Sequence, residues 1–328
     1  MSLGVVVPCY RQQKYLARTL AAIEAALEGR EWRGAIVLAA AGGGPMPPLG
    51  HRWQLIAPPV ARPLTPGASR MLGLAAIEAA WVLFVDADVE VDAAWVAEAL
   101  GVIERQPSLA GIWGRVEEWF ATDDRITPGS KDMFQVGDTE RAVEYMTTPV
   151  FYRRAALLDA GGYDPRLRSE EDFELGLRFG QLGHRLISLG RLAGRHWSAP
   201  RPSFGELTRR WSSGLCFGSG QVLRLYAGRP GFYRLLRRQS LYLATLAMWA
   251  LGLPAAAFAV AGFGGVWLAR WSILPLALLA FMTVRKRNLW LAVHSLLSWT
   301  MLGLGLLVGL SQAPEGTRAP LGTGEPAC

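Results

Sequence analysis

Two aspartates lie two residues apart, directly after an apolar run. Residues 81 to 85 are apolar throughout, and Asp86 and Asp88 follow them. Carboxylates spaced i and i+2 can reach one small region from a turn, and Mg²⁺ or Mn²⁺ binds few carboxylates together with substrate phosphates. The pair therefore indicates a metal-dependent phosphate site, although the same residues would also serve to end a strand and cap the following helix.

A second acidic pair, Glu171 and Asp172, opens a stretch typical of a helix that closes at Gly183. The dipole at a helix N-terminus favours carboxylates there, so the pair fits either a helix cap or a positioned base. His196 follows in an Arg-His-Trp run. A neutral imidazole can complete a metal shell or contact a phosphate, and a lone histidine can equally be structural.

Alternating strands and helices must position these side chains. The pattern predicts a strand that Pro8 ends, a helix with apolar residues at helical spacing, and then further strands over 35–39, 53–56, 81–85 and 110–119 and helices over 68–79, after Asp92 and over 171–182. A strand as apolar as 81–85 is typical of a central parallel strand covered on both faces. The predicted fold class is α/β with a mostly parallel sheet, with Asp86 and Asp88 at the carboxyl edge where ligands bind.

Several short segments, in this order and spacing, resemble the family 2 glycosyltransferases of the GT-A fold. They are Val5-Val6-Val7-Pro8-Cys9-Tyr10, Pro66-Gly67-Ala68-Ser69-Arg70, Phe84-Val85-Asp86-Ala87-Asp88, Tyr152-Arg153-Arg154 before Gly161-Gly162-Tyr163-Asp164, and Glu171-Asp172. The resemblance covers roughly residues 3 to 215. It implies a Rossmann-like GT-A domain and an inverting, metal-dependent transferase of hexosyltransferase type that uses a nucleotide-sugar donor.

The resemblance also implies which residues hold the donor. Pro8, Tyr10, Arg70 and Asp86 would contact it, with Asp86 on the nucleotide ribose or the metal. Arg70 and the metal, Mg²⁺ or Mn²⁺, would stabilise the charge of the departing diphosphate.

The remaining roles concern the metal and the base. Asp88 would coordinate the metal that bridges the diphosphate, and His196 matches a late histidine that approaches the metal or the diphosphate. Asp172, with Glu171 beside it, would accept the proton of the acceptor hydroxyl in a single displacement, which inverts the anomeric centre.

The chain departs from the family pattern where the nucleobase is usually read. Residues 39 to 41 are alanines, whereas the family usually has one or two aspartates there. The nucleotide therefore stays open, and a degenerate domain acting as a membrane scaffold or binding protein is the alternative. A nucleotidyltransferase is the nearest enzymatic rival, but residues 8 to 14 lack the glycine-rich phosphate loop expected of one.

The last third of the chain is apolar enough to enter a membrane. Residues 241 to 269 contain almost no charge and residues 289 to 310 form a 22-residue apolar stretch, while roughly 20 residues span a bilayer. Breaking the first stretch near Gly262 gives three helices and leaves Arg270 inside a span, which is costly unless it snorkels or faces protein. The predicted domains are a GT-A domain over 1–200, a basic and aromatic interfacial amphipathic region over 201–240, two to three transmembrane helices over 241–311 and a disordered tail over 312–328.

The positions of the basic residues indicate how the chain is oriented in the membrane. Arginines 234, 237 and 238 precede the first apolar stretch, and residues 285 to 287 are basic and precede the last. The positive-inside rule places both clusters in the cytoplasm, so we expect a multi-pass protein of the inner (cytoplasmic) membrane with a cytoplasmic catalytic domain. The formal net charge is +7. Because the arginines crowd before the apolar region, we expect a membrane surface and a lipid-linked, membrane-dissolved or polysaccharide acceptor, and no nucleic acid.

Overall fold

The computed structural model describes all residues except 1, 60–61, 122–124, 199–202, 264 and 313–328. The described residues divide into two compact units, one within Met1–Pro200 and one within Arg201–Pro314. The predicted disordered tail lies almost wholly outside the described residues. Each unit is considered by itself.

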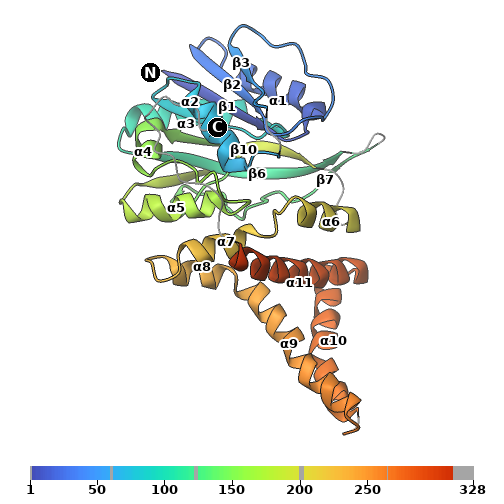
Figure 1. The fold of residues 1–328 in the computed structure, drawn as a ribbon. Coiled ribbons are helices and arrows are strands. Elements are labelled where there is room, and N and C mark those ends of the chain that lie inside the picture. Colours follow the sequence, from blue (N-terminus) through green and yellow to red (C-terminus); the bar gives the residue numbers. More distant parts are fainter. Residues whose placement is uncertain (1, 60–61, 122–124, 199–202, 264, 313–328) are drawn as a thin grey trace. The chain divides into compact units, whose positions relative to one another are not determined.

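The first unit is built on a mixed sheet with the strand order β3-β2-β1-β4-β9-β6-β10-β5 (Figure 1). Strands β3, β2, β1 and β4 are parallel, β9 is antiparallel to both β4 and β6, and β6 and β10 are parallel again. The strands are β1 Leu3–Cys9, β2 Trp32–Leu38, β3 Trp53–Ile56, β4 Trp81–Phe84, β5 Val89–Val91, β6 Gly111–Ala121, β7 Ile126–Pro128, β8 Arg141–Ala142, β9 Val150–Arg153 and β10 Leu186–Ser198. The α/β fold class with a mostly parallel sheet is confirmed.

Helices cover both faces of this sheet. They are α1 Gln13–Ala26, α2 Pro66–Ala75, α3 Ala93–Arg105, α4 Arg154–Asp159 and α5 Glu171–Gln181. Along β4, Leu83 faces the apolar cluster that contains α1 and α3, while Val82 and Phe84 face the cluster that contains α2, α4 and α5. Burial on both faces explains why residues 81 to 85 carry no polar side chain.

Several boundaries differ from the prediction by a few residues, and two of the differences have a clear physical reason. β1 continues past Pro8 to Cys9, because its pairing with β4 has ended at Val6 and only β2 still pairs there. Proline, which has no N–H to donate, is tolerated on such an unpaired side. α2 ends at Ala75 rather than Ala79, because the chain must turn back to enter β4. The sequence pattern also did not predict the short strands β7 and β8.

Among the residues that the structure describes, the second unit contains three short and three long helices, which are labelled in Figure 1. They are α6 Phe204–Ser212, α7 Gly218–Leu225, α8 Phe232–Arg238, α9 Ser240–Val260, α10 Val266–Lys286 and α11 Leu289–Ser311. The last three are long and apolar enough to cross a membrane. The prediction of three apolar helices broken near Gly262 is confirmed, and Arg270 lies within α10 with its guanidinium over the Trp267 ring.

α7 and α11 pack closely inside the second unit. A Cβ at Gly220 of α7 would lie 2.0 Å from the Leu306 carbonyl oxygen, and one at Gly309 of α11 would lie 2.0 Å from that of Phe217. Only glycine permits two backbones to approach this closely. α7 is therefore a packed helix, whereas α6 has no buried residue and its place on a membrane surface stays a prediction.

Candidate active site

The candidate site lies where the order of the parallel strands reverses. β1 is flanked by β2, which follows it in the chain, and by β4, which is reached later. In open α/β sheets the crevice at such a switch point, outside the carboxyl ends of the strands, is where ligands bind. Residues 10 to 12 follow β1 there and residues 85 to 88 follow β4.

A buried arginine organises one half of the site. Arg70 of α2 is 3% exposed. Its Nη1 lies 2.7 Å from Glu171 Oε1 and 3.6 Å from Asp172 Oδ1, and its Nη2 lies 3.2 Å from Asp86 Oδ1. The guanidinium also stacks over the Tyr163 ring at 5.1 Å. Three carboxylates from two elements thus share a single buried cation.

The start of α2 explains how Arg70 is held. The Thr65 hydroxyl caps the helix by accepting from the Ala68 N–H, and it donates to the Pro165 carbonyl at 2.6 Å. A Cβ at Gly67 would lie 2.7 Å from the Asp164 carbonyl oxygen. The proline-glycine turn therefore lets the helix start pack tightly against residues 163 to 165, and Arg70 follows one turn later.

Asp172 lies in the first turn of α5 with an altered acidity. Burial raises its pKa to about 7, with Arg70 opposing the shift and Glu171 adding to it. A hydrogen bond from Thr147 also opposes it. Its side chain nevertheless keeps 18% exposure, so a ligand can reach the carboxylate. A carboxylate with a pKa near neutrality is suited to accept a proton at physiological pH.

Asp86 bridges the buried and the open parts of the site. Its Oδ1 faces Arg70, its Oδ2 accepts from the Thr148 hydroxyl at 2.6 Å, and its side chain is 32% exposed. The structure therefore brings Arg70, Asp86, Glu171 and Asp172 together.

The other half of the site pairs Asp88 with His196. β5 and β10 pair antiparallel with His196 opposite Val89, so the imidazole lies beside the residue that precedes β5. His196 Nε2 is 3.3 Å from Asp88 Oδ2, which also accepts from Gln12 Nε2 at 2.5 Å. His196 Nδ1 lies 2.8 Å from the Ser198 hydroxyl. An oriented imidazole next to a carboxylate is a common arrangement of metal ligands.

The fit of a divalent cation can be judged from Asp88. Its Oδ1 is buried and has no hydrogen-bond partner within the described chain. Such an oxygen is costly to leave unsatisfied, and a cation held by Asp88 and His196 would satisfy it. In the part of the chain that the structure describes, no group of three or more His, Cys, Asp or Glu side chains could hold a metal ion. Asp88 and His196 are thus two candidate ligands, and substrate phosphates and water would have to fill the remaining positions.

Pro8 and Tyr10 lie at the carboxyl end of β1, where the resemblance places donor contacts. The Tyr10 N–H donates to Gln12 Oε1, so Gln12 links this turn to Asp88. Gln12 and Thr148 also belong to the site, and neither was predicted from the sequence. Gln12 could have been found from its place just after the first strand, but Thr148 has no such signal because it reaches Asp86 only through the tertiary fold.

The alanines at 39 to 41 leave the turn after β2 without a carboxylate. Ala39 and Ala40 are buried, and the Ala41 carbonyl accepts from Arg11 Nε at 3.2 Å. Gln13 Nε2 donates to the Gly42 carbonyl at 2.9 Å. The turn after β2 therefore carries no acidic side chain, and its backbone carbonyls accept from Arg11 and Gln13.

No known family profile and no curated protein matches the chain. Solved structures of S. aureus TarS are similar to it. A crystal structure of TarS 1-349 in complex with UDP-GlcNAc is 18% identical with a TM-score of 0.48, over 65% of this chain and 64% of that chain. A crystal structure of TarS 1-349 in complex with UDP is 17% identical with a TM-score of 0.47, over 94% of this chain and 92% of that chain. In the first of these matches the chain spans less than two thirds of its neighbour's length.

Proposed function

We propose that the protein is an inverting glycosyltransferase that moves a sugar from a nucleotide-sugar donor to a membrane-associated acceptor. The observation that carries this proposal is the buried Arg70, which lies among Asp86, Glu171 and Asp172 at the switch point of the sheet. A cation in that crevice suits a diphosphate, and a carboxylate with its pKa near 7 suits deprotonation of a hydroxyl.

Each residue has a part in the proposed reaction. Pro8 and Tyr10 border the donor, Asp86 binds its ribose, and Arg70 stabilises the charge that develops on the diphosphate. Asp88 and His196 would hold a divalent metal, Mg²⁺ or Mn²⁺, which supplies further positive charge to the diphosphate when it is bound.

Asp172 is the proposed general base. The acceptor oxygen forms a bond to the anomeric carbon as its proton passes to the Asp172 carboxylate, and the bond from that carbon to the diphosphate oxygen breaks. The electron pair of that bond leaves with the nucleoside diphosphate. Because nucleophile and leaving group lie on opposite faces in a single displacement, the anomeric configuration inverts. Glu171 keeps Arg70 in place through its 2.7 Å ion pair.

The second unit supports the proposed acceptor class. Three helices are long and apolar enough to cross a membrane, and they belong to the same chain as the candidate site. An acceptor that is lipid-linked, dissolved in the membrane or a polysaccharide growing at its surface fits such a chain. We place the reaction at the cytoplasmic face because the basic clusters flank these helices.

A non-catalytic scaffold is the second candidate, and the neutral turn at residues 39 to 41 favours it. One experiment on donor binding and hydrolysis distinguishes the transferase from the scaffold. Detergent-solubilised protein is mixed with a panel of nucleotide sugars, with and without Mn²⁺ or Mg²⁺, and binding and hydrolysis are followed for the parent, Asp88→Ala, Asp172→Asn and the surface control Asp159→Asn.

A transferase binds one donor, loses that binding in Asp88→Ala, and keeps binding but loses turnover in Asp172→Asn. The Asp159→Asn control behaves as the parent. If no donor binds under any condition, the scaffold is the correct assignment.

A further inference from the structure

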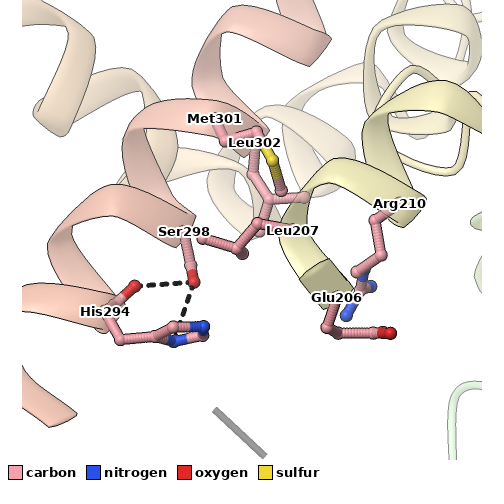
Figure 2. Close-up of a pocket in the computed structure, with 7 residues that line it drawn as sticks. All are labelled: Glu206, Leu207, Arg210, His294, Ser298, Met301 and Leu302. Carbon is pink, nitrogen blue, oxygen red and sulfur yellow. Dashed lines mark hydrogen bonds between the residues drawn. The ribbon is translucent and has the colours of Figure 1, made fainter. Parts of the chain in front are cut away.

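A cleft in the second unit lies between α6 and α11, and the proposed reaction does not use it. Its volume is about 210 Å³ and Figure 2 shows its walls. The lining residues are Glu206, Leu207 and Arg210 of α6 and His294, Ser298, Met301 and Leu302 of α11. Pockets for drug-sized ligands hold roughly 300–1,000 Å³, so this cleft suits a smaller group such as the head of a lipid.

α11 contributes polar side chains to the cleft, although it is long and apolar enough to cross a membrane. His294 and Ser298 are one turn apart and face the cleft from a predominantly apolar helix (Figure 2). The Ser298 hydroxyl donates to the His294 carbonyl at 2.7 Å, but the ring nitrogens are 3.4 Å from Ser298 Oγ and from the Ser203 carbonyl oxygen. These ring contacts are long for hydrogen bonds, so the imidazole can still engage a ligand. Polar groups within apolar spans usually mark functional sites.

The α6 wall carries a positive charge that is not balanced locally. Glu206 is held by Arg209 through two contacts of 2.8 Å, so its carboxylate is already neutralised. Arg210 forms no ion pair with any residue that the structure describes, and its Nε is buried without a hydrogen-bond partner there. The cleft therefore attracts an anion, and a guanidinium binds phosphate oxygens in a bidentate manner.

The rest of the surroundings are apolar. Leu207, Met301 and Leu302 complete the lining. Next to it, the Phe204 and Trp290 rings meet edge to face at 4.9 Å, and the Trp290 ring lies 6.2 Å from that of His294. Exposed aromatic residues of this kind gather at the level of lipid headgroups. An occupant must therefore join an anionic head to an apolar chain.

We propose that the cleft between α6 and α11 binds the phosphate headgroup of an anionic membrane lipid, one whose phosphate carries no cationic group. Arg210 and His294 contact the phosphate, and the lipid chain lies along Leu207, Met301 and Leu302. A lipid is favoured over free phosphate because one wall of the cleft is a candidate membrane span. The site belongs wholly to the second unit, so the proposal does not depend on the transferase assignment.

The test measures lipid binding to the full-length chain, not activity. Native mass spectrometry of the detergent-solubilised protein counts bound dioleoyl phosphatidic acid, with phosphatidylcholine of the same chains and inorganic phosphate as comparisons. The variants are Arg210→Gln, His294→Gln and the control Arg229→Gln, an exposed arginine of the same unit outside the cleft.

We expect one phosphatidic acid to bind per chain, with neither phosphatidylcholine nor inorganic phosphate displacing it at equal concentration. Arg210→Gln should weaken binding about tenfold or more, as expected when a hydrogen bond to a charged group is lost. His294→Gln should weaken it less, and Arg229→Gln should leave it unchanged. If size exclusion shows that Arg210→Gln does not fold, the phosphatidic acid binding of His294→Gln is compared with that of the control instead. Equal binding by the folded cleft variants and the control, or equal displacement by inorganic phosphate, would overturn the proposal.

Discussion

The fold makes Asp172 a weaker acid than a free aspartate. Burial raises its pKa to about 7. Below that pH the carboxyl is protonated and cannot accept a proton, so the turnover of a base-catalysed transfer should fall on the acid side with an apparent pKa near 7. We expect kcat/KM to show this limb, and Asp172→Asn to lose about 10²–10⁴-fold in rate with donor binding retained. Steady-state kinetics between pH 5 and 9 measure both.

The same shift has a consequence for stability. Because the folded-state pKa lies above the ordinary value of 3.8, the contribution of Asp172 to stability is fully present below pH 3.8 and is lost as pH rises through about 7. The stability of Asp172→Asn relative to the parent should therefore be greater at pH 8 than at pH 5. If the difference in free energy of unfolding between Asp172→Asn and the parent does not change with pH, Asp172 does not have a raised pKa in the folded protein.

Arg70 is the residue on which the carboxylates depend. Arg70→Gln leaves Glu171, which is 6% exposed, without its cation. Breaking a buried ion pair costs about 3–5 kcal/mol, so we expect a loss of that size in the free energy of unfolding at pH 8. Arg191→Gln removes an exposed pair with Glu98 and should cost less than about 1 kcal/mol. Urea unfolding followed by tryptophan fluorescence compares them, and similar losses would show that the Arg70 cluster contributes little.

Among the elements, the short strand β5 brings the two residues of the candidate metal site together. It has only three residues, Val89–Val91, yet its antiparallel pairing with β10 places His196 beside Asp88. We predict that Mn²⁺ binds at this pair and that Asp88→Ala and His196→Gln each weaken it by tenfold or more, about 1.4 kcal/mol. Electron paramagnetic resonance of Mn²⁺ titrated in the presence of a nucleoside diphosphate measures this.

The first unit contains a matched control for that prediction. His184 Nε2 lies 2.9 Å from Asp159 Oδ2, so the same two residue types meet away from the switch point. His184→Gln should leave Mn²⁺ binding unchanged. If His184→Gln and His196→Gln have the same effect, the metal is not held at the Asp88 pair.

The sequence predicted the elements better than it predicted the contacts between them. The apolar run at 81–85, the turn at Pro66 and the acidic start of α5 each have a local signal, so their strands and helices could be placed to within a few residues. The meeting of Asp86 with Thr148 depends on how loops from separate strands approach, and no local pattern encodes it. The cleft between α6 and α11 was missed for the same reason, because it joins residues more than 80 positions apart.

At the scale of the whole molecule, the number of membrane crossings determines which side each segment faces. The positive-inside rule predicts that the first unit and the basic residues 285 to 287 lie in the cytoplasm, and that the turn between α9 and α10 lies on the other side. Cys9 and Cys216 are buried, so in a Cys328→Ser background a new cysteine is the reactive one. We propose Ala261→Cys, which lies in that exposed turn, and Glu104→Cys on the surface of the first unit.

A membrane-impermeant maleimide added to intact cells should label Ala261→Cys and leave Glu104→Cys unlabelled until the membrane is permeabilised. Labelling of Glu104→Cys alone would reverse the orientation, because the catalytic unit would then lie outside. Protection of both until permeabilisation would mean that α9 and α10 do not cross the bilayer. The labelling pattern therefore tests the orientation on which a cytoplasmic nucleotide-sugar donor depends, since the donor must be on the same side as Asp88 and Asp172.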